Sequence, residues 1–425
     1  MAKIEKSNQK INPFGGLNFV IDQIDKLGLS QLVDNQLGER SKLAKYSFSD
    51  IIKSLWSVFF CGGNCAEDIN EHLRRYLKDI PGLNIPNSDT ILAVLKKLKT
   101  DNTKVTSING NTYEININEK LNLLNLSILL KTNQLIENNY YDFDYDNEVL
   151  PTNKYDAKNT YKHTKGYFPG MATINGMPIY FENREGNMHV KQNQEEVLER
   201  CFNLLKTNKI FINRGRFDSG SYSKNIVDVV EKYSKKFYIR AMRCNTMYNQ
   251  VRDIKEWNKA EINYIDYEVQ SINYQPFGSE KTYRLVISRE QSKNTQIDLL
   301  TNDTMVYRSI LTNDWESDEK SIIEYYNQRG KEEKTIDILN NDFGWSNMPF
   351  SFMNENTVFL MLMMMCKNIF GCLIKSFSEK MPWLKENFRL KKFIFRFITV
   401  PVKWIKSGGQ RILKMFTDKD YKLNI

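Results

Sequence analysis

Three carboxylates spaced two residues apart, Asp142, Asp144 and Asp146, lie in a short acidic and aromatic segment. Side chains two apart in a β-strand point to one face, so these carboxylates would lie opposite Phe143 and Tyr145. Stacked carboxylates repel one another, and a hard cation such as Mg²⁺ would relieve that repulsion. An acidic edge strand in open water gives the same pattern and stays an alternative.

A further carboxylate, Asp218, follows an apolar run that begins at Ile210 and precedes Ser219-Gly220-Ser221. The small residues can turn the chain and cap the next helix. A carboxylate at the carboxyl end of a strand sits where α/β sheets commonly place their ligand sites. Asp218 would fit equally well as a turn or cap residue.

The last chemical pattern is Tyr326, Arg329 and Glu333. On a continuous helix, Glu333 lies about 20° from Tyr326 around the axis, whereas the adjacent Glu332 lies about 120° away. This face would bring a guanidinium that can pair with phosphate beside a carboxylate. An ordinary salt-bridged helix would show the same spacing.

The elements that must position these residues change along the chain. Residues 1–130 are predicted to be helical, with Ser47 or Ser49 and the 87–90 segment able to cap two of the helices. Three short helices between residues 47 and 98 suit a helix-turn-helix-like DNA-binding domain.

From residue 135 the pattern predicts an α/β core. We expect strands at 141–150, 209–217 and 236–242, helices at 194–205 and 222–233, and a hairpin around Asn175-Gly176. The core would cover 135–243 and 315–378, and a β-rich insertion at 244–314 would interrupt it. A tail at 379–425 would follow.

Composition fits a folded protein of several units, with 41% hydrophobic residues in 425. The start of the chain has no apolar stretch of signal-peptide length, so we expect a cytoplasmic protein. The most apolar run, residues 358–374, is predicted to be a buried core helix, so no membrane partner is expected. Cys61 and Cys65 lack a second pair at zinc-site spacing, so no structural zinc is expected.

The tail is strongly basic. Residues 385–425 contain 11 Lys or Arg against three acidic residues, which accounts for +8 of the net charge of +9. Such a segment is typical of a surface that binds nucleic acid, although a solvated surface is an equal alternative. The candidate DNA-binding residues of the tail are Lys385, Arg389, Lys391, Lys392 and Arg396.

The chain resembles the DDE transposases of bacterial insertion sequences, in the branch with a β-rich insertion, through its Tyr326, Arg329 and Glu333 spacing. It is most similar to the insertion-sequence family numbered thirteen-eighty. The matching segments are Asp146-Asn147, Pro151-Thr-Asn-Lys-Tyr-Asp-Ala-Lys158, Gly166-Tyr-Phe-Pro-Gly170, Arg184-Glu-Gly-Asn187 and Phe217-Asp-Ser-Gly-Ser-Tyr222. The likeness runs from Cys61 to Phe397.

This resemblance implies an RNase H-like mixed-sheet core with the catalytic residues Asp146, Asp218 and Glu333. These would hold two Mg²⁺ or Mn²⁺ ions for cleavage and strand transfer of double-stranded DNA. The implied partners are terminal inverted repeats and target DNA, bound by a homodimer, with Tyr326 and Arg329 contacting DNA.

Two positions depart from the family pattern: Asn340 stands where relatives have Lys, and Glu148 where they have a small polar residue. Another RNase H-like nuclease, or a non-catalytic DNA-binding protein or repressor derived from a transposase, are the alternative functions. A non-catalytic protein has no need of clustered carboxylates, which repel DNA, so the three acids favour an enzyme.

Overall fold

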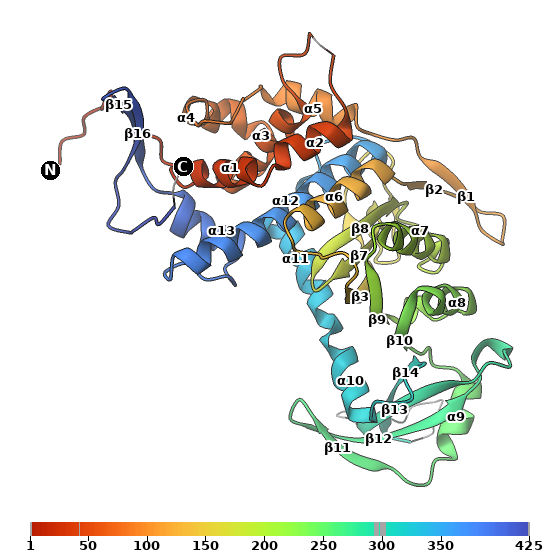
Figure 1. Cartoon of the computed structure of the whole chain (residues 1–425). Coiled ribbons are helices and arrows are strands. Elements are labelled where there is room, and N and C mark those ends of the chain that lie inside the picture. Colours follow the sequence, from red (N-terminus) through yellow and green to blue (C-terminus); the bar gives the residue numbers. More distant parts are fainter. Residues whose placement is uncertain (1, 42, 293–296, 298–302, 424–425) are drawn as a thin grey trace.

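A single mixed sheet of eleven strands runs through the protein in the computed structural model. The structure describes residues 2–41, 43–292, 297 and 303–423. Side chains are described for all of these residues except 331–333. The strands lie in the order β1-β2-β8-β7-β3-β9-β10-β14-β13-β12-β11 (Figure 1). They are β1 (Thr103–Thr106), β2 (Thr112–Asn116), β3 (Tyr140–Asn147), β7 (Gly170–Ile174), β8 (Met177–Arg184), β9 (Phe211–Phe217), β10 (Ser234–Arg240), β11 (Asn258–Ile262), β12 (Ile265–Tyr274), β13 (Tyr283–Gln291) and β14 (Met305–Thr312).

Only the central strands of this sheet are parallel: β9 lies parallel to both β3 and β10. β7 and β8 form the predicted hairpin, and Asn175 and Gly176 turn the chain with φ angles of 53° and 72°. Such positive φ values at both central residues are typical of a tight hairpin turn. The mixed α/β prediction is confirmed, and a small separate sheet contains β4 (Leu150–Pro151), β5 (Lys158–Asn159) and β6 (Lys165–Tyr167).

Two helices cover one face of the sheet, as their apolar spacing predicts. α7 (Gln194–Thr207) and α8 (Lys224–Tyr233) pack against the face that carries Phe143 and Tyr145. The strand at β9 and both helices were therefore predicted within a few residues of their observed ends. Beyond β10, the segment 244–314 contains α9 (Asn245–Arg252) and strands β11–β14, which continue the same sheet.

The N-terminal region is mainly helical. Its helices are α1 (Leu17–Lys26), α2 (Leu29–Leu37), α3 (Phe48–Phe60), the π-turn η1 (Ile69–Leu73), α4 (Arg74–Leu77), α5 (Ser88–Lys96) and α6 (Glu119–Lys131). Ser47 caps α3 in a reciprocal pair with Asp50, and Asn87 caps α5. The β1–β2 hairpin was not predicted, and Ile115 of β2 pairs with Arg184 of β8.

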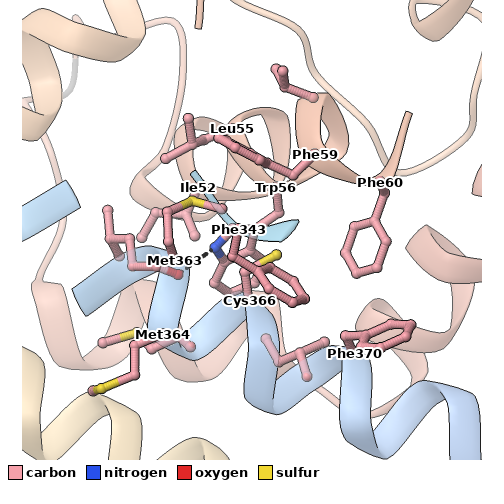
Figure 2. Close-up of a cluster of buried hydrophobic side chains, with 14 of the residues drawn as sticks. Ile52, Leu55, Trp56, Phe59, Phe60, Phe343, Met363, Met364, Cys366 and Phe370 are labelled. Carbon is pink, nitrogen blue, oxygen red and sulfur yellow. Dashed lines mark hydrogen bonds between the residues drawn. The ribbon is translucent and has the colours of Figure 1, made fainter. Parts of the chain in front are cut away.

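The apolar run predicted to be a core helix forms α12 (Met353–Lys380). By length and composition this helix could cross a membrane, but 83% of its most apolar window is buried inside the fold. Figure 2 shows the aromatic side chains of α3 packed against α12, where Trp56 Nε1 donates to the Leu362 carbonyl at 2.9 Å. The N-terminal helices and α12 thus share one core.

The described part of the basic segment after α12 contains α13 (Leu390–Phe393), the short π-helix η6 (Ile394–Ile398) and a two-stranded ribbon. The ribbon strands are β15 (Val402–Ser407) and β16 (Gln410–Met415), and they lie near the N-terminal end of the chain in Figure 1. Asn12 and Val402 exchange backbone hydrogen bonds of 2.9 and 2.8 Å. The two ends of the chain are therefore joined at the base of this ribbon.

Candidate active site

The acidic face of β3 has the predicted alternation, with Phe143 and Tyr145 buried on the opposite face. Two of its three carboxylates are neutralised by the neighbouring parallel strand β9. Arg216 donates to both oxygens of Asp144 at 2.7 and 2.6 Å, in a pair that is almost fully buried. Arg214 binds Asp142 in the same manner, with Nε 2.9 Å from Oδ1.

Tyr325 supports both arginines from the helix that covers this face, α10 (Glu319–Asn327). The Arg214 and Arg216 guanidinium groups lie 3.9 and 4.6 Å from its ring centroid, at distances typical of cation–π contacts. Arg216 also donates to the Tyr325 carbonyl at 2.9 Å. We did not predict these partners from the sequence, although Arg214 and Arg216 repeat the two-residue spacing of the acids.

Asp146 is the remaining acid, and β9 supplies no arginine to it. Tyr145 pairs with Phe217, the last residue of β9, so Asp218 follows beside Asp146. The pKa of Asp146 is raised to about 6, mainly because the carboxyl is buried; Arg329 lowers the pKa, and the nearby negative charge of Asp218 raises it. The structure thus brings two of the three predicted catalytic acids together, where their negative charges interact.

Arg329 provides positive charge at this point. Its Nη2 lies 2.9 Å from Asp146 Oδ2, with both side chains 14% exposed. The contact is an ion pair without hydrogen-bond alignment, and among the described residues neither Nη2 nor the buried Nε finds a hydrogen-bond acceptor. This guanidinium therefore retains unused donors next to the carboxylates.

Tyr326 has a positioning role here. Its buried hydroxyl donates to the carbonyl of Phe217 at 3.0 Å, which fixes the end of β9 directly before Asp218. The ring also lies 5.5 Å from the Arg240 guanidinium. In this structure the tyrosine contacts the protein scaffold of the acids, and its predicted contact with DNA stays a prediction.

The prediction of one continuous helix through Tyr326 and Glu333 is wrong. α10 ends at Asn327, the 3₁₀ turn η4 covers Gln328–Gly330, and α11 begins at Lys331 and ends at Asp342. A 3₁₀ turn advances about 120° per residue, which places Glu333 about 40° and Glu332 about 60° from Tyr326 on opposite sides. Glu333 lies in the first turn of α11, and its side chain is outside the described part of the structure.

A cavity of about 600 Å³ opens beside Asp218. Four of the sequence segments that carry the resemblance meet at its walls, through Asn147, Phe168, Gly186–Asn187 and Asp218–Gly220. The fully buried Arg184 organises one wall, because its Nη2 donates to the carbonyls of His189 and Gln192 at 2.8 and 3.0 Å. These separate motifs therefore form one site around the carboxylates.

Residues 139–422 match a protein family described as transposase DDE domain, group 1. The match covers more than half of the chain and includes β3, β9 and α11. The chain belongs to this DDE transposase family. Membership confirms the resemblance to DDE transposases and supports a DNA-processing transposase function, while the narrower family numbered thirteen-eighty stays a prediction. A search of curated proteins gave no match.

The two departures from the transposase pattern have ordinary surroundings. Glu148 is neutralised by Lys162, whose Nζ lies 2.8 Å from Oε1, so this fourth acid has a partner of its own. Asn340 lies in α11, where its carbonyl accepts a hydrogen bond from Ser346 Oγ at 2.9 Å.

The basic residues predicted in the C-terminal segment of the transposase divide into two groups. Lys385, Lys391 and Lys392 line a shallow hollow of about 680 Å³ together with Arg389. The Arg389 guanidinium is already engaged, because its Nε and Nη1 donate to Asp342 and Asp337 at 2.9 Å. Arg396 is exposed and does not line this hollow.

The Asp144–Arg216 pair should contribute far more to stability than the Asp142–Arg214 pair. Asp144→Asn leaves a buried guanidinium without its counter-charge, and we expect the free energy of unfolding to fall by about 3–5 kcal/mol. The partly exposed Asp142→Asn should cost about 1 kcal/mol or less. Urea denaturation of both variants checks this, and equal losses would contradict the assigned difference in burial.

Proposed function

We propose that this chain cuts DNA at the ends of an insertion sequence and joins them to target DNA. Asp146, Asp218 and Glu333 would hold two divalent ions, Mg²⁺ or Mn²⁺. The observation that carries the proposal is the selective neutralisation of the acidic strand. Arginines of β9 bind Asp142 and Asp144, whereas Asp146 lies beside Asp218 at the ends of two parallel strands. Its charge partner is Arg329, which comes from another part of the chain.

The strand order supports an RNase H-like core. β3, β7 and β8 follow one another as an antiparallel meander, and β9 and β10 lie parallel to β3 on its other side. In this five-strand unit Asp146 lies on the first strand and Asp218 follows the fourth, as the resemblance to DDE transposases implies. α11, with Glu333, comes after the β-rich segment.

The described donors fit a hard divalent cation. Asp146 and Asp218 offer carboxylate oxygens, the ligand type that Mg²⁺ prefers, and their mutual repulsion favours a bound cation. Among the side chains that the structure describes, no cluster of three potential ligands occurs. The side chain of Glu333, the expected third ligand, lies outside that set.

When bound, two such ions would activate the attacking oxygen and stabilise the leaving one. The protein side chains would bind and orient the DNA. Arg329 can turn its Nε, which has no acceptor among the described residues, toward a phosphate oxygen, because a guanidinium matches phosphate through a fork of donors. Tyr326 keeps Asp218 in register with Asp146 through the Phe217 carbonyl.

The decisive experiment is an end-cleavage assay on the intact protein. Duplexes that carry the two ends of its own element are incubated with Mg²⁺ or Mn²⁺, and EDTA provides the metal-free control. We expect nicks at the element ends and joined products only with metal. Sequence-specific binding to the ends without any cleavage would instead support a DNA-binding repressor.

The C-terminal hollow should contribute non-specific affinity for the DNA backbone. We expect Lys385→Ala, Lys391→Ala and Lys392→Ala together to weaken binding to every duplex. The slope of log K against log salt concentration should become less steep by at most about three. Fluorescence anisotropy over a range of salt concentrations measures both. Arg389→Ala is the matched comparison, because that guanidinium is occupied by two aspartates.

This prediction concerns backbone contacts only. A loss of affinity confined to the element ends, with unchanged binding to an unrelated duplex, would contradict it.

The N-terminal helices remain the proposed part that reads the DNA sequence. Helix α3 is buried on nearly all sides, so α5 is the better candidate for a helix that contacts bases.

A further inference from the structure

A second hollow, of about 450 Å³, shares a wall residue with the cavity beside Asp218. Both hollows are lined by Ser219, the residue after Asp218. The walls of the second carry three arginines, Arg240, Arg243 and Arg308. Among the described residues that line it there is no aspartate or glutamate, so we call it the arginine hollow.

The sheet holds two of these arginines on one face. Arg240 is the last residue of β10 and pairs with Ile310 of β14. Arg308 lies two residues from Ile310, so its side chain projects from the same face as that of Arg240. Arg240 is also fixed by the ring of Tyr326, which is hydrogen-bonded to the strand before Asp218. The positions of the arginines and of the catalytic acids are therefore coupled.

Ion pairing in the arginine hollow differs between Arg308 and Arg240. Glu290 pairs with Arg308, but among the described residues no carboxylate forms an ion pair with Arg240. Burial lowers the pKa of Arg240. Tyr326 raises it, and the neighbouring guanidinium groups of Arg308, Arg243 and Arg329 lower it. A half-buried cation among like charges costs folding free energy, and binding of an anion would offset that cost.

We propose that the arginine hollow binds a phosphate of the DNA backbone, a short distance along the strand from the phosphodiester that reacts at Asp146 and Asp218. The guanidinium fork matches phosphate geometry, and Ser219 and Ser309 add hydroxyl donors at the wall. The inference rests on the proposed function, because that function makes DNA the anion. It adds a phosphate-binding site formed by β10 and β14.

The test is Arg240→Gln, with DNA binding measured by fluorescence anisotropy in EDTA so that no cleavage occurs. We expect the affinity to fall about tenfold. The slope of log K against log salt concentration should become less steep by about 0.9, as for one lost phosphate contact. The melting temperature of the DNA-free variant should equal or exceed that of the unchanged protein, because the substitution removes like-charge repulsion.

The matched control is Arg289→Gln on the adjacent strand β13. Arg289 does not line the arginine hollow: it is paired with Glu268 at 2.6 Å, lies over the Trp257 ring and donates to the Tyr307 hydroxyl at 3.3 Å. We expect this variant to keep the DNA affinity and the salt slope. A second probe is inorganic phosphate, which should raise the melting temperature of the unchanged protein more than that of Arg240→Gln at equal ionic strength.

Two outcomes overturn the proposal. One is an unchanged affinity and slope in Arg240→Gln, and the other is a fall in its melting temperature, which would assign Arg240 to the scaffold. Because binding is measured without metal, the result is separate from the end-cleavage assay. Reduced binding in a protein that never cleaves its ends would leave the phosphate site in place and remove the proposed function.

Discussion

Asp146→Asn should abolish cleavage of the element ends while DNA binding persists. The substitution removes a charged oxygen donor from the site that we propose for the metal ions, and loss of such a ligand lowers turnover by several orders of magnitude. It also removes one negative charge beside Asp218, so affinity for DNA should stay equal or increase. Gel-based end cleavage and anisotropy in EDTA measure the two effects.

Glu148→Gln is the matched control for Asp146→Asn. Glu148 lies two residues further along the chain and has Lys162 as a partner, so its loss should leave most of the cleavage activity. Cleavage retained in Asp146→Asn but lost in Glu148→Gln would contradict the assignment of Asp146 and identify Glu148 as the first metal ligand.

Glu333→Gln should lose end cleavage by several orders of magnitude, whereas Glu332→Gln should keep most of it. The reason is the match of Glu333 to the family's catalytic glutamate. The helical angle no longer separates the two acids, since the η4 turn places them at similar angles from Tyr326. The same cleavage assay compares them directly.

Adjacent glutamates in one helical turn make a matched pair, because both substitutions remove one charge from the start of α11. A similar melting temperature for the two variants would confirm that folding is unaffected. Equal cleavage in both, or cleavage lost only in Glu332→Gln, would contradict the assignment of Glu333.

The sequence predicted how side chains alternate between the two faces of a strand, but it did not predict the ion pairs between distant strands. The two-residue spacing in β3 predicted the acidic face and the buried Phe143 and Tyr145. It could not show which acids are paired by the neighbouring strand, because Arg214 and Arg216 lie 72 residues from their partners. Only the parallel register of β3 and β9 determines that Asp146 has no arginine from β9.

Two other features could not be predicted from the local sequence pattern. Strand β2 follows several helices and joins the sheet through two residue pairs with β8, a contact between distant parts of the chain. The helix break at Gln328–Gly330 is local, but the glycine there could equally belong to a continuous helix. Hydrophobic spacing did predict β9, α7, α8 and the core helix α12, whereas α9 and the β15–β16 ribbon were not predicted.

The core shared by α12 and the N-terminal helices sets the limits of any shortened form of the protein. A fragment that begins at residue 139, where the family match begins, would lack α3 and α6 and uncover α12. This helix is apolar enough to resemble a membrane span once its partners are removed. Such a fragment should therefore be recovered in aggregates or bound to lipid, although it contains both aspartates of the active site.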